Sequence, residues 1–313
     1  MGRLLAALDA QTLPRDRWEC IVVLDGVPLS GALAARLEAS GTIVVVIPER
    51  RGPGAARNAG ARHASGDTLA FTEDDCAPAP DWLAAAAGRL DPDRSIDVLE
   101  GATILPGGAV ARRRHGDRPT WLPTNLFVRR ETFERVGGYC ERFFEPRGGV
   151  YFREDSDFGF TLAEAGARVA VDAAPRVIHP REHSSWLDPL RWARRYEMDP
   201  LLSARHPEAF REEMEVLRWG HIRLRRPFVR ACVGYVVALT TAAAAAIIGE
   251  TGVAVWLVGV AALLAVLIWA KWRWDPRKLP AVLLVPPILV LSLLKGRERV
   301  HKAEAGHQSA SAK

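Results

Sequence analysis

Two uncharged runs near the C-terminus constrain the fold of this chain more than any other feature. Residues 231–249 and 251–270 contain no Asp, Glu, Lys or Arg, and Glu250 is the one charged residue near their junction. A helix needs about 20 apolar residues to cross the roughly 30 Å hydrocarbon layer of a membrane. The two runs therefore predict a transmembrane helical hairpin over residues 231–270.

Basic residues flank this hairpin on both sides. They are Arg223, Arg225, Arg226 and Arg230 before it and Lys271, Arg273, Arg277 and Lys278 after it. Cytoplasmic flanks of membrane helices carry an excess of Lys and Arg, so we expect both flanks and the soluble part of the chain in the cytoplasm, at the inner cell membrane. The formal net charge of +5 is concentrated there, which favours a membrane surface over nucleic acid.

Three further segments accompany the hairpin. Residues 184–230 are rich in Trp and Arg and predict amphipathic juxtamembrane helices, lying at the lipid interface or packing against the soluble domain. Residues 279–295 form a third hydrophobic segment broken by Pro286-Pro287, re-entrant or spanning, and we favour the re-entrant form. Residues 303–313 are small and polar and predict a disordered tail.

The first part of the chain alternates between strand and helix patterns. Continuous β-branched runs at 20–24 (CIVVL) and 42–47 (TIVVVI) indicate buried parallel strands, with helical patterns between them. This alternation predicts an α/β fold with a mostly parallel sheet and helices on both faces. Residues 50–60 (RRGPGAARNAG) form a Gly-rich turn that leads into a helix, where Arg57 and Asn58 could reach a phosphate or a sugar. Simple helix initiation is the alternative for the glycines.

Three adjacent carboxylates follow the short apolar run at residues 69–71. They are Glu73, Asp74 and Asp75. Open α/β sheets bind ligands at the carboxyl ends of their strands. Neighbouring carboxylates repel one another unless a cation lies among them, and hard oxygen ligands suit Mg²⁺ or Mn²⁺. A solvated acidic turn is the alternative interpretation.

A second acidic group begins the helix after residue 153. Glu154 and Asp155 are suited to acid–base chemistry, although acids at a helix N-terminus also oppose the helix dipole. His179 ends the last predicted strand and is a candidate metal ligand or a structural histidine. The loop 139–153 contains Gly and Pro among aromatic and charged residues, which is typical of a mobile active-site loop. Residues 111–118 are a basic polar loop, and the four cysteines show no CxxC spacing.

Five motifs in order resemble family 2 glycosyltransferases of the GT-A fold. They are QTLPRDRWECIVVLDG, RRGPGAARNAG, FTEDDCAPAPDW, NLFVRRETFERVGGY and EDSDFGFTLAEAGARV, and the likeness runs from residue 3 to residue 179. We therefore expect a GT-A-like glycosyltransferase domain at 1–183. The resemblance implies transfer of a sugar from a nucleotide-sugar donor to a hydroxyl acceptor, with inversion and a divalent metal.

The resemblance also implies residue roles. Asp75 matches the metal-binding aspartate of the family's DxD motif, with Glu73 at its first place, and His179 resembles a histidine near the metal. Asp155, beside Glu154, matches the catalytic base. The implied donor-binding residues are Asp25, Arg57, Asn58, Glu73 and Asp74. Residues 188–192 (DPLRW) depart from the QxxRW motif of processive members, which favours a non-processive enzyme.

Two other functions compete with this one. They are a sugar nucleotidyltransferase and a catalytically inactive, membrane-anchored nucleotide-sugar-binding protein. The membrane segments favour a lipid-linked or glycan acceptor in cell-envelope glycan or glycolipid synthesis. The family also begins with a strand for which Met1 leaves no room, so we expect a natural chain to carry an N-terminal extension that ends in an apolar strand. A natural truncation with weakened donor binding is the alternative.

Overall fold

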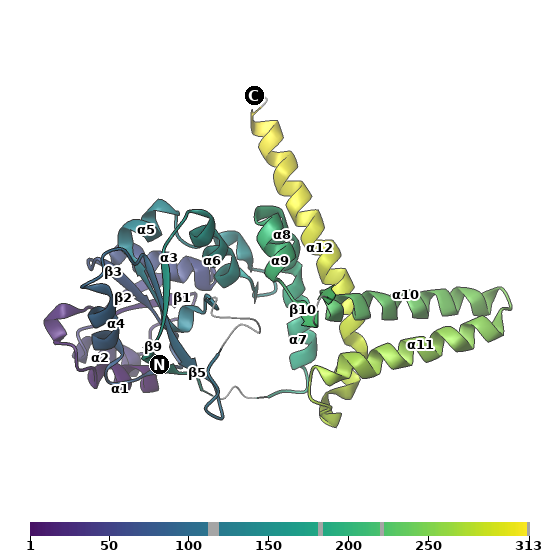
Figure 1. Ribbon diagram of the computed structural model, residues 1–313, viewed down its shortest axis with the longest axis horizontal. Helices are drawn as coiled ribbons and strands as arrows, with labels where there is room; N and C mark the ends of the chain where they lie inside the picture. The colour runs from purple at the N-terminus through teal and green to yellow at the C-terminus, as the bar shows by residue number, and fades with distance from the viewer. Residues whose placement is uncertain (112–118, 181–183, 220–221, 312–313) are drawn as a thin grey trace. The chain divides into compact units, whose positions relative to one another are not determined.

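The computed structural model describes residues 1–111, 119–180, 184–219 and 222–311. The chain divides into two compact units, Met1–Glu182 and His183–Lys313, and each is described by itself (Figure 1). The basic loop predicted at 111–118 lies, apart from its first residue, outside the described residues.

The first unit contains a small parallel sheet. β1 (Ile21–Asp25) pairs in parallel with β2 (Ile43–Ile47), and α2 (Gly31–Ala39) connects them. The β-branched runs thus form the strands that their composition predicts. α3 (Pro53–His63) follows β2, with a proline at its start and Gly52 at φ +89° before it.

The second sheet of this unit has five strands. β3 (Thr68–Phe71), β6 (Leu126–Arg129), β5 (Val98–Ile104), β9 (Val169–Ile178) and β4 (Ala77–Pro78) lie in that order. Only β5 and β9 are parallel in it, and the other three pairings are antiparallel. The prediction of a mostly parallel sheet is therefore wrong in this sheet, because hydrophobic patterns reveal strands but not their partners.

Helices cover both faces of the five-stranded sheet, as predicted. α4 (Trp82–Leu90) packs on one face with Leu99 and Phe127, while α6 (Glu154–Glu164) packs on the other with Val98 and Val128. α5 (Arg130–Arg135) lies on the α6 face, where its Phe133 is buried. The loop 139–153 contains a single-turn helix, η3 (Glu141–Phe143), and a short hairpin of β7 (Phe144–Glu145) and β8 (Val150–Tyr151).

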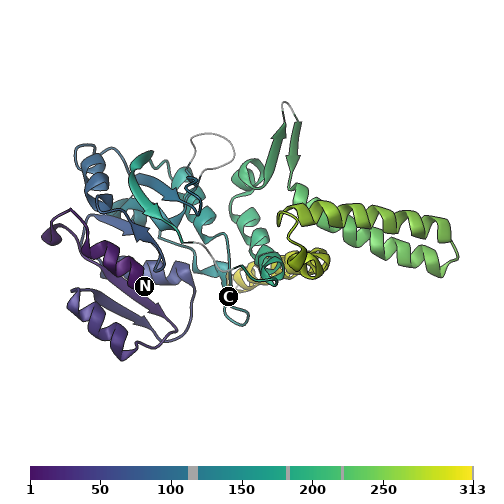
Figure 2. The same ribbon diagram turned by 90° about the horizontal axis from the view of Figure 1, so that it is seen from below.

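Helix α1 (Gly2–Asp9) joins the cores of the two sheets (Figure 2). Its Leu4 and Leu8 pack in the cluster under the five-stranded sheet, whereas Leu5 packs with Val22 and Leu24 of β1. Burying a leucine stabilises a fold by about 1.5–3 kcal/mol, so three leucines make this helix a substantial link. β1 pairs with β2 alone among the described strands.

Helix α6 is positioned by a tryptophan from a distant segment. Trp121 is held by Glu100 of β5, whose carboxylate accepts hydrogen bonds from the backbone N–H groups of Thr120 and Trp121 at 2.8 and 2.6 Å. Its indole lies flat against Gly159, where a Cβ atom would overlap the ring. Only glycine therefore allows α6 to approach this close.

The second unit begins with three short helices, α7 (Asp188–Arg195), α8 (Asp199–Arg205) and α9 (Pro207–Glu213). A β-hairpin follows, formed by β10 (Val216–Trp219) and β11 (Ile222–Arg225). The sequence predicted helices throughout residues 184–230, so the hairpin is a correction. Val216-Leu217 and Ile222 supply β-branched and apolar residues, and antiparallel pairing satisfies their backbone groups.

Among the described residues of this unit, three helices are long and apolar enough to cross a membrane. They are α10 (Pro227–Ile247), α11 (Thr251–Ala270) and residues 276–305, most of which belong to α12 (Leu279–Ser311). α10 and α11 form the antiparallel hairpin that the sequence predicted (Figure 1). Side chains such as Ile247, 85% exposed, and Val255, 74% exposed, cover its outer surface, as lipid contact requires.

Helix α12 differs from two expectations. It runs continuously through Pro286 and Pro287, without the turn that a re-entrant segment needs, and it continues to Ser311 where a disordered tail was predicted. A proline removes one backbone hydrogen bond and can kink a helix without ending it, and apolar helix formers surround this pair.

Helix α12 packs on α7, α8 and α10, around Tyr196, Cys232 and Val285. A buried carboxylate, Glu197, accepts hydrogen bonds from Lys295 at 3.0 Å and Arg299 at 2.9 Å. Gly296 lies against the Glu197 carbonyl oxygen, where a Cβ would overlap it. Helices α7 and α8 therefore pack on α12.

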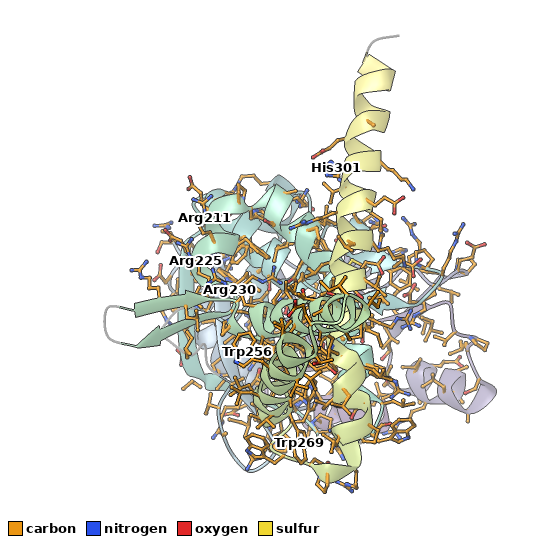
Figure 3. The ribbon with its side chains drawn as sticks, turned by 90° about the vertical axis from the view of Figure 1, so that its right-hand side faces the viewer. Arg211, Arg225, Arg230, Trp256, Trp269 and His301 are labelled. Atoms are coloured by element: carbon orange, nitrogen blue, oxygen red, sulfur yellow. The ribbon has the colours of Figure 1, made fainter. Side chains whose placement is uncertain are left out.

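Figure 3 shows Arg225 and Arg230 near the start of α10 and Trp269 at the end of α11.

Candidate functional site

A cluster of four side chains of types that can ligate a metal lies where β3 and β9 end. Its members are Glu73, Asp75, Cys76 and His179, whose ligand atoms all lie within 4.8 Å of one another. The Cys76 N–H donates to the Glu73 carbonyl oxygen at 3.1 Å, which closes a turn directly after β3. β4 then pairs with the end of β9, Ala77 opposite Ile178, and this pairing brings Cys76 beside His179. The structure thus brings Glu73, Asp75 and His179 together.

Glu73 is the most connected carboxylate of the cluster. Its Oε2 accepts a hydrogen bond from Thr124 at 3.2 Å and lies 3.7 Å from His179 Nε2, while Oε1 lies 3.5 Å from Arg57. Thr124 precedes β6, which is antiparallel to β3, so the start of β6 lies beside the end of β3. These contacts fix the orientation of the Glu73 carboxylate.

The ring orientation of His179 suits a metal ligand. Nδ1 lies 2.9 Å from the carbonyl oxygen of Pro180. A carbonyl oxygen only accepts hydrogen bonds, so Nδ1 carries the proton, and in the neutral ring the lone pair is on Nε2, the nitrogen nearest Glu73. A histidine whose other nitrogen donates to a backbone carbonyl is the usual arrangement around bound metals. The residues present therefore fit a divalent cation.

Arg57 connects this cluster to the second acidic group. Its guanidinium lies 3.5 Å from Glu73 and 3.4 Å from Glu154, and it stacks 5.2 Å from the ring centre of Tyr139. Burial lowers the pKa of Arg57. Tyr139, Glu154 and Glu73 raise it by more than burial lowers it, so the pKa lies above its ordinary value. A cation on α3 thus lies between two carboxylates from different elements, one in the turn after β3 and one at the start of α6.

Glu154 and Asp155 begin α6 and have different surroundings. Glu154 is buried, and burial together with the neighbouring Asp155 raises its pKa, although Arg57 opposes the rise. Asp155 is half-buried, and its Oδ1 accepts hydrogen bonds from the N–H and hydroxyl of Ser156 at 2.6 and 3.3 Å. Two adjacent carboxyls in unlike surroundings are an arrangement in which one can act as base while the other is held in place.

Besides Arg57, three of the predicted donor-binding residues lie outside the cluster. Asp25 accepts hydrogen bonds from the backbone N–H groups of Arg51 and Gly52, both at 2.7 Å, and so fixes the turn before α3. Asn58 is buried and exchanges hydrogen bonds with the backbone of Tyr139 at 2.8 and 2.9 Å. Asp74 has a 74% exposed side chain near the N-terminal ammonium.

Sequence reasoning missed three residues of this region: Cys76, Thr124 and Tyr139 as a partner of Arg57. Cys76 is fully buried, and burial with the nearby Asp75 and Glu73 raises the pKa of its thiol well above the ordinary value. Its position directly after Asp75 was a usable signal. Thr124 had no signal, since its place depends on antiparallel pairing.

Comparison with known proteins identifies the family. The model for glycosyl transferase family 2 matches residues 1–156, and relatives that match along the chain carry glycosyltransferase names. The chain belongs to glycosyl transferase family 2.

Two relatives and one solved structure illustrate the likeness. Glycosyltransferase AglE of Haloferax volcanii is 26% identical over 180 residues, 52% of this chain and 59% of that protein. An N-acetylglucosaminyl-diphospho-decaprenol L-rhamnosyltransferase of Mycobacterium tuberculosis is 36% identical over 80 residues, 25% of this chain and 24% of that protein. This chain therefore spans less than two thirds of the curated relatives' length.

The solved structure is a mannosyltransferase from Pyrobaculum calidifontis in complex with GDP-Man and Mn²⁺. It is similar with a TM-score of 0.56 and 19% identity, over 94% of this chain and 82% of that one. At this identity the likeness shows the fold, and it confirms the GT-A fold that the sequence predicted.

Proposed function

We propose that the protein is a membrane-associated glycosyltransferase that moves a sugar from a nucleotide-sugar donor to a hydroxyl group of its acceptor, with inversion and without processive elongation. The observation that carries this proposal is the Arg57 bridge. It holds the metal-ligating cluster beside the Glu154–Asp155 pair, so that a leaving group and a base can act on one sugar.

The proposed chemistry assigns a task to each group. A divalent cation, Mg²⁺ or Mn²⁺, held by Asp75, Glu73 and His179 would stabilise the negative charge of the leaving nucleoside diphosphate. Asp155 accepts the proton of the attacking hydroxyl, on the face of the sugar opposite the leaving group. Arg57 orients Glu154 and Glu73 and adds positive charge where the diphosphate departs.

The donor contacts extend from this centre. Asp25 stabilises the turn that begins α3 and, by the family resemblance, contacts the nucleoside. Asn58 orders the Tyr139–Glu141 segment along the site. The Asp74 side chain is exposed beside the N-terminal ammonium, so we assign it the smallest share of donor binding.

The acceptor is proposed to be lipid-linked. α10 and α11 are long and apolar enough to anchor the chain in a membrane, and basic residues flank them. The name of the Mycobacterium tuberculosis relative specifies a diphospho-decaprenol-linked acceptor for that protein. We therefore place the soluble unit at the cytoplasmic face of the cell membrane, acting in cell-envelope glycan or glycolipid synthesis.

The decisive experiment compares two neighbouring aspartates. Donor binding by the full chain in detergent is titrated with UDP-, GDP- and dTDP-sugars, with and without Mn²⁺. Asp75→Ala is expected to abolish the metal-dependent part, because it removes a metal ligand. Asp74→Ala is the matched control and is expected to change binding less than about threefold, since its side chain is exposed.

Three results would contradict the proposal. Equal loss in both variants would mean that general charge, and not a metal site, binds the donor. Release of inorganic diphosphate from a sugar phosphate and a nucleoside triphosphate would instead identify a nucleotidyltransferase. Donor binding without any transfer to polyprenyl-linked or free acceptors would favour the inactive binding protein.

A further inference from the structure

The metal-ligating cluster contains one donor that a magnesium or manganese site does not need. Three of its members offer two carboxylates and a ring nitrogen, and the fourth is the thiol of Cys76. Mg²⁺ and Mn²⁺ prefer oxygen ligands, whereas Zn²⁺ and Cd²⁺ prefer thiolate and imidazole. Zn²⁺ also binds a given site more tightly than Mn²⁺ in the usual order of divalent affinities.

The backbone fixes the thiol within this cluster. Cys76 closes the turn that begins at Glu73, and the residue after it pairs with β9 directly before His179. The Cys76 thiol donates to Asp75 Oδ1 at 3.5 Å. Its sulfur therefore faces the carboxylates.

Core packing is the ordinary role of a buried cysteine, and Cys76 does contact apolar residues. It belongs to the cluster that contains Leu4, Trp82 and Val177, and it is 0% exposed. Packing alone, however, does not account for a sulfur within 4.8 Å of one ring nitrogen and two carboxylates. His179 strengthens the case, because its Nδ1 hydrogen bond leaves the Nε2 lone pair on the cluster side.

We propose that Cys76 makes this cluster a binding site for thiophilic divalent cations, above all Zn²⁺. The ligands are Cys76 Sγ, His179 Nε2 and the carboxylates of Asp75 and Glu73. On binding, the thiol proton leaves to solvent and a sulfur–metal bond forms, without oxidation or reduction. The site rests on the proposed function in one respect: Zn²⁺ occupies the place of the Mg²⁺ or Mn²⁺ that supports transfer, and so inhibits it.

The test reads out the sulfur–metal bond itself. The full chain in detergent is titrated with Cd²⁺ alone, and the ultraviolet thiolate-to-cadmium charge-transfer band is recorded. The wild type and Cys20→Ser, which changes another cysteine of the same unit, are expected to show the band. Cys76→Ser and Cys76→Ala are expected to lose it, and His179→Ala to weaken Cd²⁺ binding by roughly 10–100-fold. Using both Cys76 variants guards against a folding defect in either, which thermal unfolding reports.

The outcomes separate this proposal from the proposed function. A band that persists in folded Cys76→Ser, or no band in the wild type, overturns the thiol site. Mn²⁺-dependent donor binding, measured on the same samples, tests the proposed glycosyltransferase function. If donor binding does not depend on Mn²⁺ but the cadmium band is intact, the proposed function alone is overturned. Excess Mn²⁺ is expected to displace Cd²⁺ and remove the band, and a band insensitive to Mn²⁺ would contradict a shared site.

Discussion

Two buried glutamates, one in each unit, meet their cations in different ways. Glu197 in the second unit accepts from Lys295 and Arg299 at 3.0 and 2.9 Å, so one carboxylate has two cations. Glu154 in the first unit shares a single guanidinium with Glu73, at 3.4 and 3.5 Å, and has Asp155 as its neighbour. Burial and Asp155 raise the pKa of Glu154 despite Arg57.

The difference distinguishes a structural ion pair, whose charges balance, from a site whose negative charge favours binding of a further cation. Around Glu197 the positive charge is sufficient, and the pair ties α12 to the segment after α7. Around Arg57 the carboxylates outnumber the cation, which costs stability unless another cation binds. Natural proteins tolerate such local costs mainly at functional sites.

Loss of the proposed base is expected to have the largest effect. Asp155→Asn keeps the shape of the side chain but cannot accept the acceptor's proton, so turnover falls by about 10²–10⁴-fold. Donor binding and the unfolding temperature stay near those of the wild type. Glu164→Gln, at the other end of α6, is the matched control and keeps full turnover. Wild-type turnover in Asp155→Asn would remove Asp155 from the mechanism.

Loss of the Glu197 ion pair is expected to lower the stability of the protein and not its activity. Glu197→Ala leaves Lys295 and Arg299 without their shared carboxylate, which costs on the order of 3 kcal/mol, at the lower end for a broken buried pair because both cations are partly solvated. Tryptophan fluorescence during thermal unfolding in detergent measures this, with the exposed Glu208→Ala as control. An unchanged unfolding temperature would make Glu197 as dispensable as a surface residue.

Two glycines test how closely α12 packs at Glu197. Gly296→Ala places a methyl group against the Glu197 carbonyl oxygen and is expected to cost roughly 1–3 kcal/mol, as overpacking does. Gly259→Ala in α11 meets no atom within 4 Å and is expected to be neutral or slightly stabilising. Equal unfolding temperatures for the two variants would contradict close packing of α12 at Glu197.

The smallest expected effect is the pH dependence caused by Glu154. A carboxyl with a raised folded-state pKa contributes its full stability below the unfolded pKa and loses it as pH rises through the folded pKa. Glu154→Gln removes this loss. Its unfolding temperature should match the wild type near pH 4 and exceed it at higher pH, by about 2–4 °C per kcal/mol. A difference that shrinks with rising pH would mean that Arg57 satisfies Glu154 fully.

The sequence predicted the elements of the first unit better than their partners. The β-branched runs correspond to β1 and β2, and the helix predicted after the Gly-rich turn corresponds to α3. The antiparallel place of β6 did not follow from any pattern, because pairing depends on the whole sheet. β10 and β11 were missed since short mixed strands rich in Arg and Trp resemble an amphipathic helix.

The site was predictable to a similar extent. The carboxylates after β3, those at the start of α6 and the histidine after β9 were identified from their positions at element ends. The structure brings Glu73, Asp75 and His179 together. Asp74 lies near the N-terminal ammonium and Asn58 bonds to the backbone of Tyr139, so neither joins the cluster. Adjacent residues at a strand end or in a helix direct their side chains differently, which separates them from Asp75 and Arg57. Thr124 required the register of β6, which only the fold supplies.

The contact between Trp121 and Gly159 has a consequence for how variation is tolerated. Gly159 lies one helical turn after Asp155, so whatever moves the helix at residue 159 moves the carboxylate too. A displacement of about 1 Å in a reacting group can lower a rate by roughly 100-fold. In a library of random variants, position 159 should therefore behave as part of the active site, although its residue has no side chain to react.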